Sequence, residues 1–287
     1  MHVILWYSWI SISVTFLAIR AFSPRLRSIL HRPLLTRQLP YLAKHLTVSG
    51  ASLVLWVAVL YGSVVGIWWI RIRDYFDTRG RQNGVFAGNE RLAAIALTGH
   101  FCDVSMGMVL LPISRHSALS SFFKLSVSTT LAFHTIMAYA LFTLVLLHGS
   151  LYVSWVPVFH RMSPHLRMVF PVLNPTYLYN ESWPGNTLSL GIWRASLTFT
   201  GLFAATIMCL IFVTSFPAIR AKHFNIFYFT HLSIILAIVV VCLHASTMFY
   251  CISPGLVMWL LDWSMRLHEL RKSLNAQITT LGNGWYW

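Results

Sequence analysis

Charged residues are scarce in this sequence, and acidic residues are the scarcest of all. Only 10% of the 287 residues are charged, with 7 Asp or Glu against 21 Lys or Arg. Hydrophobic residues make up 57% of the chain, and the mean hydropathy is +0.66. Soluble globular domains carry about 25% charged residues. The composition is therefore that of a membrane protein rather than of a soluble domain.

Closely spaced cysteine pairs are also missing, and so is any pattern of basic residues that indicates nucleic-acid binding. The four cysteines are too far apart to form a C-x-x-C pair, and three of them lie in apolar runs. This pattern indicates neither a disulfide framework nor a zinc site. The net charge of +14 does not indicate nucleic acid, because the basic residues lie in loops between apolar runs, where they set membrane orientation.

Apolar runs long enough to cross a bilayer recur along the chain. They predict an all-α fold, a polytopic transmembrane helix bundle with about seven spans. The expected spans are 3–20, 47–70, 92–113, 126–154, 187–216, 225–249 and 255–266. We expect three regions: an N-terminal span with a basic cytosolic linker (1–46), the main bundle (47–268) and a cytosolic tail (269–287). Lys and Arg are more frequent in the segments that face the cytosol when the N-terminus is outside, although the Arg-rich loop 71–91 opposes this bias.

Histidines occur at unusual places inside the apolar runs. His134 and His148 lie fourteen residues apart in one span, and His231 and His244 lie thirteen apart in another. At 1.5 Å per residue, each pair extends over roughly 20 Å of helix, so one member lies toward each leaflet. The two spans run in the same direction, because one full crossing separates them. His134 can therefore face His231, and His148 can face His244.

Two facing imidazole pairs at different depths are what two six-coordinate haems require. Small residues follow the outer histidines, namely Gly149, Ala245 and Ser246, and would admit a porphyrin close to the backbone. The helical phase agrees for His134 and His148, which share a face. It does not agree for His231 and His244, which lie about 140° apart on an ideal helix.

Other interpretations stay open at this point. A single membrane histidine is more often a hydrogen-bonded core residue than a ligand, although ionisable groups in lipid are usually functional. A histidine-lined proton or metal channel without haem is the main alternative. His100 has no partner at a matching spacing. With Asp103 one turn further on, it forms either a satisfied buried polar pair or part of a proton or metal path.

Flanking segments resemble those of a known family. The pairs H-x13-H and H-x12-H, in this order, resemble the membrane domain of ferric-chelate reductases and NADPH oxidases, and most of all plant-type ferric reductases. The supporting segments are "LPISRHSAL" (111–119), "LLHGSLYV" (146–153), "PAIRAKHFNIFYFTH" (217–231) and "LDWSMRL" (261–267).

The resemblance implies a function. It implies that six of the spans form a haem-binding core with two b-type haems, held by His134 with His231 and by His148 with His244. Electrons would pass from a cytosolic flavin and NADPH to an outside ferric chelate, cupric ion or oxygen, in an oxidoreductase of the plasma membrane. Arg115 and Arg194 are candidate partners of the haem propionates, with solvated loop cations as the alternative.

The flavin part is not evident in this sequence. No Gly-rich dinucleotide fingerprint follows a strand pattern in the residues given. We therefore expect FAD and NADPH to bind a missing or separate domain, or a separate reductase that serves this chain as a membrane haem subunit.

Overall fold

The computed structural model describes residues 2–30, 32, 48–82, 90–111, 127–161 and 197–270. Throughout these residues the regular structure is helical, and no strand occurs among them. The predicted all-α bundle is confirmed. Arg115 and Arg194 lie outside the described residues, as do residues 187–196 of the expected fifth span and the segment after residue 270.

Ten helices make up the described part of the chain. They are α1 (His2–Phe22), α2 (Pro24–Leu30), α3 (Val48–Gln82), α4 (Glu90–Leu110), α6 (Val127–Arg161), α9 (Leu197–Thr214), α10 (Pro217–Lys222), α11 (Phe224–Leu232), α12 (Ile234–His244) and α13 (Ser246–Leu270). Four segments are long and apolar enough to cross a membrane: Gly50–Thr78, Glu90–Leu110, Val127–Trp155 and Phe224–His244. Two shorter apolar helices, His2–Phe16 and Thr200–Thr214, accompany them.

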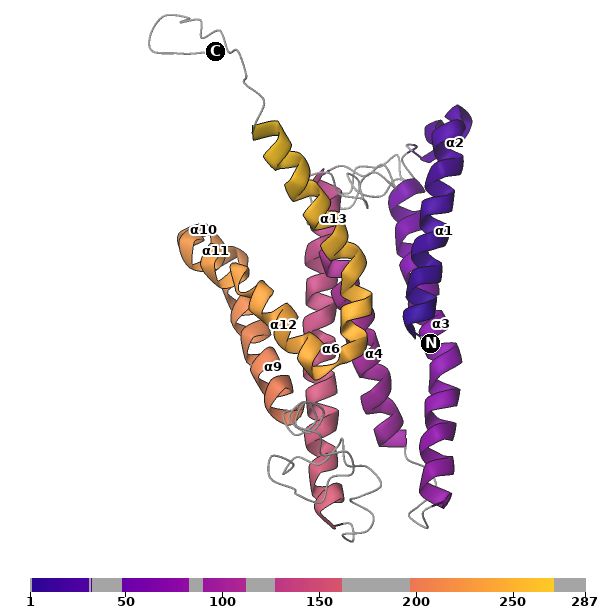
Figure 1. Ribbon diagram of the computed structural model, residues 1–287, viewed down its shortest axis with the longest axis vertical. Helices are drawn as coiled ribbons and strands as arrows, with labels where there is room; N and C mark the ends of the chain where they lie inside the picture. The colour runs from indigo at the N-terminus through magenta and orange to yellow at the C-terminus, as the bar shows by residue number, and fades with distance from the viewer. Residues whose placement is uncertain are drawn as a thin grey trace, which may run out of the picture.

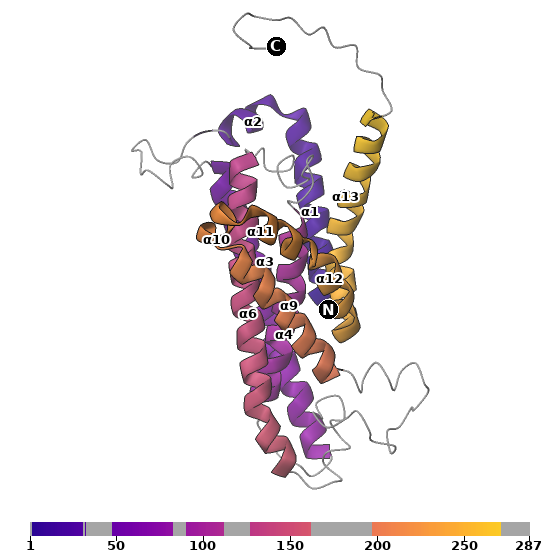
Figure 2. The same ribbon diagram turned by 90° about the vertical axis from the view of Figure 1, so that its left-hand side faces the viewer.

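Helix α4 is the centre of the bundle. In its most apolar 18-residue stretch, 72% of the residues are buried, against 17% or less in the corresponding stretches of the other three candidate spans. It packs against α1, α3, α6 and α13, and Figures 1 and 2 show it among these helices. The outer helices instead expose apolar side chains, among them Leu146 on α6 and Ile235 on α12. Such a surface suits contact with lipid tails, where the helical backbone satisfies its own hydrogen bonds.

Glycines bring α4 and α13 into close contact. A Cβ on Gly107 would lie 2.5 Å from the carbonyl oxygen of Cys251, and one on Gly255 would lie 2.8 Å from the Cβ of Leu110. Small residues at such crossings let two membrane helices approach backbone to backbone. The crossing positions α13 beside the part of α4 that carries the polar residues described below.

The chain from residue 217 to 270 is more broken than the sequence suggested. One span was expected over 225–249 and a short one over 255–266. Instead α11 ends at Leu232, α12 ends at His244, and α13 extends over 25 residues. Ala245 has an extended backbone (φ −135°, ψ 104°), so the chain turns directly after His244. Figure 1 shows α12 and α13 meeting at this turn.

Candidate functional site

Helices α6 and α11–α12 bring four histidines together as two pairs. Both segments run in the same direction through the bundle (Figure 1). The ring centres of His134 and His231 lie 6.3 Å apart, with an angle of 68° between the ring planes. Those of His148 and His244 lie 6.4 Å apart, with an angle of 86°. All four side chains are partly buried.

The helical segment that carries His231 and His244 is irregular between these two residues. Ser233 separates α11 from α12, and its backbone N–H donates to the carbonyl of Thr230, three residues back, at 3.1 Å. An i→i−3 bond marks a tighter turn of about 120° per residue instead of about 100°. Because His231 and His244 are about 140° short of a whole number of turns on an ideal helix, the tighter turn shifts the phase in the direction that reduces the mismatch.

Helix α4 orients both histidines of α6. The ring nitrogen Nδ1 of His134 donates to the carbonyl of Val109 at 2.9 Å, and that of His148 donates to the carbonyl of Ile95 at 3.0 Å. A carbonyl can only accept, so the proton of each neutral ring is on Nδ1. The lone pair of each ring is then on Nε2, which is the usual arrangement for a metal-ligating histidine.

The two histidines of α11–α12 are held differently. His244 Nδ1 lies 3.4 Å from the hydroxyl oxygen of Thr200 on α9. His231 Nδ1 is buried, and no hydrogen-bond partner for it occurs among the described residues. The ring of Phe227, one turn earlier, lies 5.2 Å from the ring of His231. Two further aromatic residues on α11, Tyr228 and Phe229, are largely exposed.

A repeated Thr-Gly step supports the outer pair, and the sequence interpretation missed it. Thr98 lies 3.2 Å from His148 Nδ1, and a Cβ on Gly99 would lie 3.4 Å from His148 Cε1. On α9, Thr200 faces His244 Nδ1, and a Cβ on Gly201 would lie 2.8 Å from His244 Cε1. Each histidine therefore rests against a glycine on a neighbouring helix and beside a threonine hydroxyl. The recurrence of Thr-Gly in two apolar spans was the available signal.

The ring separations fit two ligands of one metal. A metal–imidazole bond measures about 2 Å, and the nitrogen lies about 1 Å from the ring centre. Two rings on opposite sides of one metal therefore have centres about 6 Å apart, as both pairs do. A direct hydrogen bond between two rings would bring their nitrogens to about 3 Å, whereas the Nδ1 atoms of His134 and His148 are bonded to backbone carbonyls.

Comparison with known proteins assigns the chain to a family. The profile of one protein family, described as "Ferric reductase like transmembrane component", matches residues 98–242, about half of the chain. The chain belongs to this family. The matched segment includes His134, His148 and His231, and His244 lies two residues beyond its end. With its apolar helices, this ferric-reductase-like chain is an integral membrane protein.

Individual relatives of this ferric-reductase-like chain are distant plant proteins. Ferric reduction oxidase 7, chloroplastic, of Arabidopsis thaliana is 21% identical over 72% of this chain and 24% of its own length. Ferric reduction oxidase 2 of the same plant is 22% identical over 63% of this chain and 21% of its own. The chain thus spans about a quarter of the length of the relatives it matches.

Proposed function

We propose that this chain is the membrane electron-transfer unit of a reductase and that it holds two b-type haems. His134 and His231 ligate the inner haem, and His148 and His244 ligate the outer one. The observation that carries the proposal is the pair of facing rings, 6.3 and 6.4 Å between centres, on helices that run in the same direction. Membership of the ferric reductase family supports it independently.

The protein's contribution is to orient the four imidazoles and to keep water away from them. Val109 and Ile95 fix the tautomers of His134 and His148 by accepting from Nδ1. Such hydrogen bonds also make the ligating nitrogen a better donor. When bound, haem supplies a reversible one-electron couple whose potential depends on its ligands, hydrogen bonds and burial. Two protein ligands per iron leave no coordination position for a substrate, so outer-sphere electron transfer is the reaction that this ligand set suits.

The stretch of α6 between the two pairs is apolar. His134 and His148 are fourteen residues apart on this helix, which corresponds to about 21 Å along its axis. Between them Met137 and Leu141 are buried, with 5% and 3% of their surfaces exposed, in the same core cluster as α4 residues. An apolar stretch offers few ligands to a moving proton or metal ion, so it favours the passage of electrons between the pairs over the passage of protons or metal ions.

The donor and the acceptor belong to the proposal as well. The relatives are named ferric reduction oxidases, so we place a ferric chelate first as the acceptor, ahead of a cupric ion or oxygen. NADPH and FAD, on a further domain or a separate reductase, would deliver the electrons from the cytosolic side of the plasma membrane. Arg115 and Arg194 remain the predicted partners of the haem propionates.

Haem content of the purified full chain tests the proposal. We expect two low-spin b-type haems per chain, and about one in His134→Ala and in His148→Ala. His223→Ala is the matched control, because this histidine is exposed beside α11 and has no assigned role. A folded but colourless protein would favour the channel alternative. Two haems in His148→Ala would disprove the ligand assignment.

Electron transfer has its own test. The haem-loaded chain in sealed liposomes, with a reductant inside, should reduce a ferric chelate outside. Each single-histidine variant should lose this reduction, while His223→Ala should keep it. Equal rates in liposomes without protein would remove the support for transmembrane transfer even if both haems are present.

A further inference from the structure

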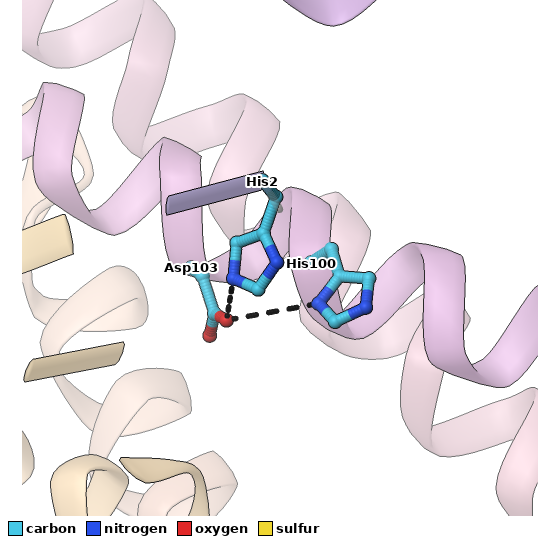
Figure 3. A group of neighbouring side chains, drawn as sticks. All are labelled: His2, His100 and Asp103. Carbon is cyan, nitrogen blue, oxygen red and sulfur yellow. Dashed lines mark hydrogen bonds and ion pairs between the residues drawn. The ribbon is translucent and has the colours of Figure 1, made fainter. Parts of the chain in front are cut away.

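A second cluster of potential metal ligands lies where α1 meets α4. His2 of α1 meets His100 and Asp103 of α4, and Figure 3 shows the two rings and the carboxylate directed toward one another. His2 Nε2 lies 2.9 Å from Asp103 Oδ2, and His100 Nδ1 lies 3.9 Å from the same oxygen. One ligand atom from each of the three residues lies within 4.8 Å of the others. Sequence analysis did not point to His2, because this residue precedes the first expected span.

The cluster is largely buried and contains a carboxylate. His2 and Asp103 are each 2% exposed. Within the described part of the chain, Asp103 forms ion pairs with His2 and His100 but with no Lys or Arg. Neutral imidazoles do not cancel the charge of a carboxylate. A buried carboxylate is costly unless a cation accompanies it, so a metal ion or a protonated histidine would stabilise this site.

A ring nitrogen of His2 without a hydrogen-bond partner favours the metal ion. His2 Nδ1 is buried, and no hydrogen-bond partner for it occurs among the described residues. The rings of His2 and His100 are stacked with centres 4.0 Å apart, which disfavours a positive charge on both. Two imidazoles and one carboxylate form a ligand set that suits zinc, with a further position left for water.

The surroundings resemble those that orient metal ligands. The hydroxyl of Thr247, at the start of α13, donates to Asp103 Oδ2 at 2.7 Å and so fixes the carboxylate. The ring centre of Trp68 on α3 lies 4.9 Å from that of His100 and 6.0 Å from that of His2. The Trp68 ring therefore covers the cluster. The His100 side chain remains 23% exposed, which leaves an entry for an ion.

We propose that His2, His100 and Asp103 form a binding site for a divalent transition-metal ion, with zinc as the best match. The site joins α1 to α4, and through Thr247 it reaches α13. It is separate from the four histidines of the two facing pairs. It therefore stands or falls independently of the haem proposal.

Zinc binding to the full chain tests this inference. The purified protein is treated with a chelator, dialysed against zinc and measured by elemental analysis. We expect one zinc per chain in the wild type and in His223→Ala. In Asp103→Asn, which keeps the side-chain shape, and in His100→Gln, we expect that zinc to be lost.

Two further measurements distinguish loss of the site from misfolding of a variant and from zinc bound at the histidine pairs. Zinc should raise the unfolding temperature of the wild type but not of either site variant, which reports the site even if a variant folds poorly. The double variant His134→Ala/His148→Ala should keep its zinc, because haem-free pairs could otherwise bind the ion. A wild type that binds no zinc, or site variants that bind as much as the wild type, would overturn the inference and indicate a protonated histidine beside Asp103.

Discussion

Replacing Gly201 by alanine is the sharpest probe of the outer histidine pair. The new Cβ would lie 2.8 Å from Cε1 and 3.1 Å from Nδ1 of His244. Carbon atoms in favourable contact are about 3.5–4.0 Å apart, so the ring or the helix would have to move by about 1 Å. A free side chain makes this movement easily, whereas a ring fixed on a metal does not.

The expected magnitude follows from this difference. Overpacking a rigid site costs about 1–3 kcal/mol, and each 1.4 kcal/mol is a factor of about 10 in affinity. The affinity of the outer site for haem should therefore fall by about 5- to 150-fold. Stability of the haem-free protein should change little, because alanine favours a helix over glycine by about 1 kcal/mol.

Haem titration into the haem-free protein measures both effects. Gly66→Ala is the matched control, because a Cβ at this helical position would have no neighbour within 4 Å. We expect Gly201→Ala to retain the inner haem and to bind the outer one weakly, while Gly66→Ala binds both like the wild type. Wild-type affinity for both haems in Gly201→Ala would refute the idea that His244 is held in place by a metal.

Three further outcomes follow from the same contacts. Thr200→Val removes the hydroxyl beside His244 Nδ1 and should weaken the outer haem by about 10- to 100-fold, measured by the same titration, with the inner haem unchanged as the internal control. Gly107→Ala should destabilise the bundle by about 1–3 kcal/mol, seen in thermal unfolding against Gly62→Ala, because the new Cβ would meet the backbone carbonyl of Cys251. The ring planes, 68° and 86° apart, should give the oxidised haems strongly anisotropic EPR signals, more so for the outer one; equal and weakly anisotropic signals would contradict these ring orientations.

Much of the architecture could be predicted because composition and periodicity act over many residues. The low charge content and the repeated apolar runs determine a helical membrane bundle, whatever the details of packing. On a continuous helix, the spacing of His134 and His148 also gives the difference between their depths in the membrane. The rise per residue is constant as long as the helix is regular.

Other features depended on local irregularities that spacing does not reveal. The prediction for His231 and His244 assumed a regular helix, on which the two side chains point apart. The break at Ser233 changes that phase, and serine, unlike proline or glycine, is not a residue that indicates a helix break in the sequence. His2 was missed because its partners, His100 and Asp103, lie about a hundred positions away and meet it only through helix packing.

The turn at Ala245 limits how this chain can vary in length. His244 is the last residue of α12, and Thr247, which fixes Asp103, lies only three positions later. Adding or deleting one residue before His244 would rotate its ring by about 100°, and the same change after it would displace Thr247. A homologous protein that carries an insertion here could therefore keep the outer histidine or the threonine in place, but not both.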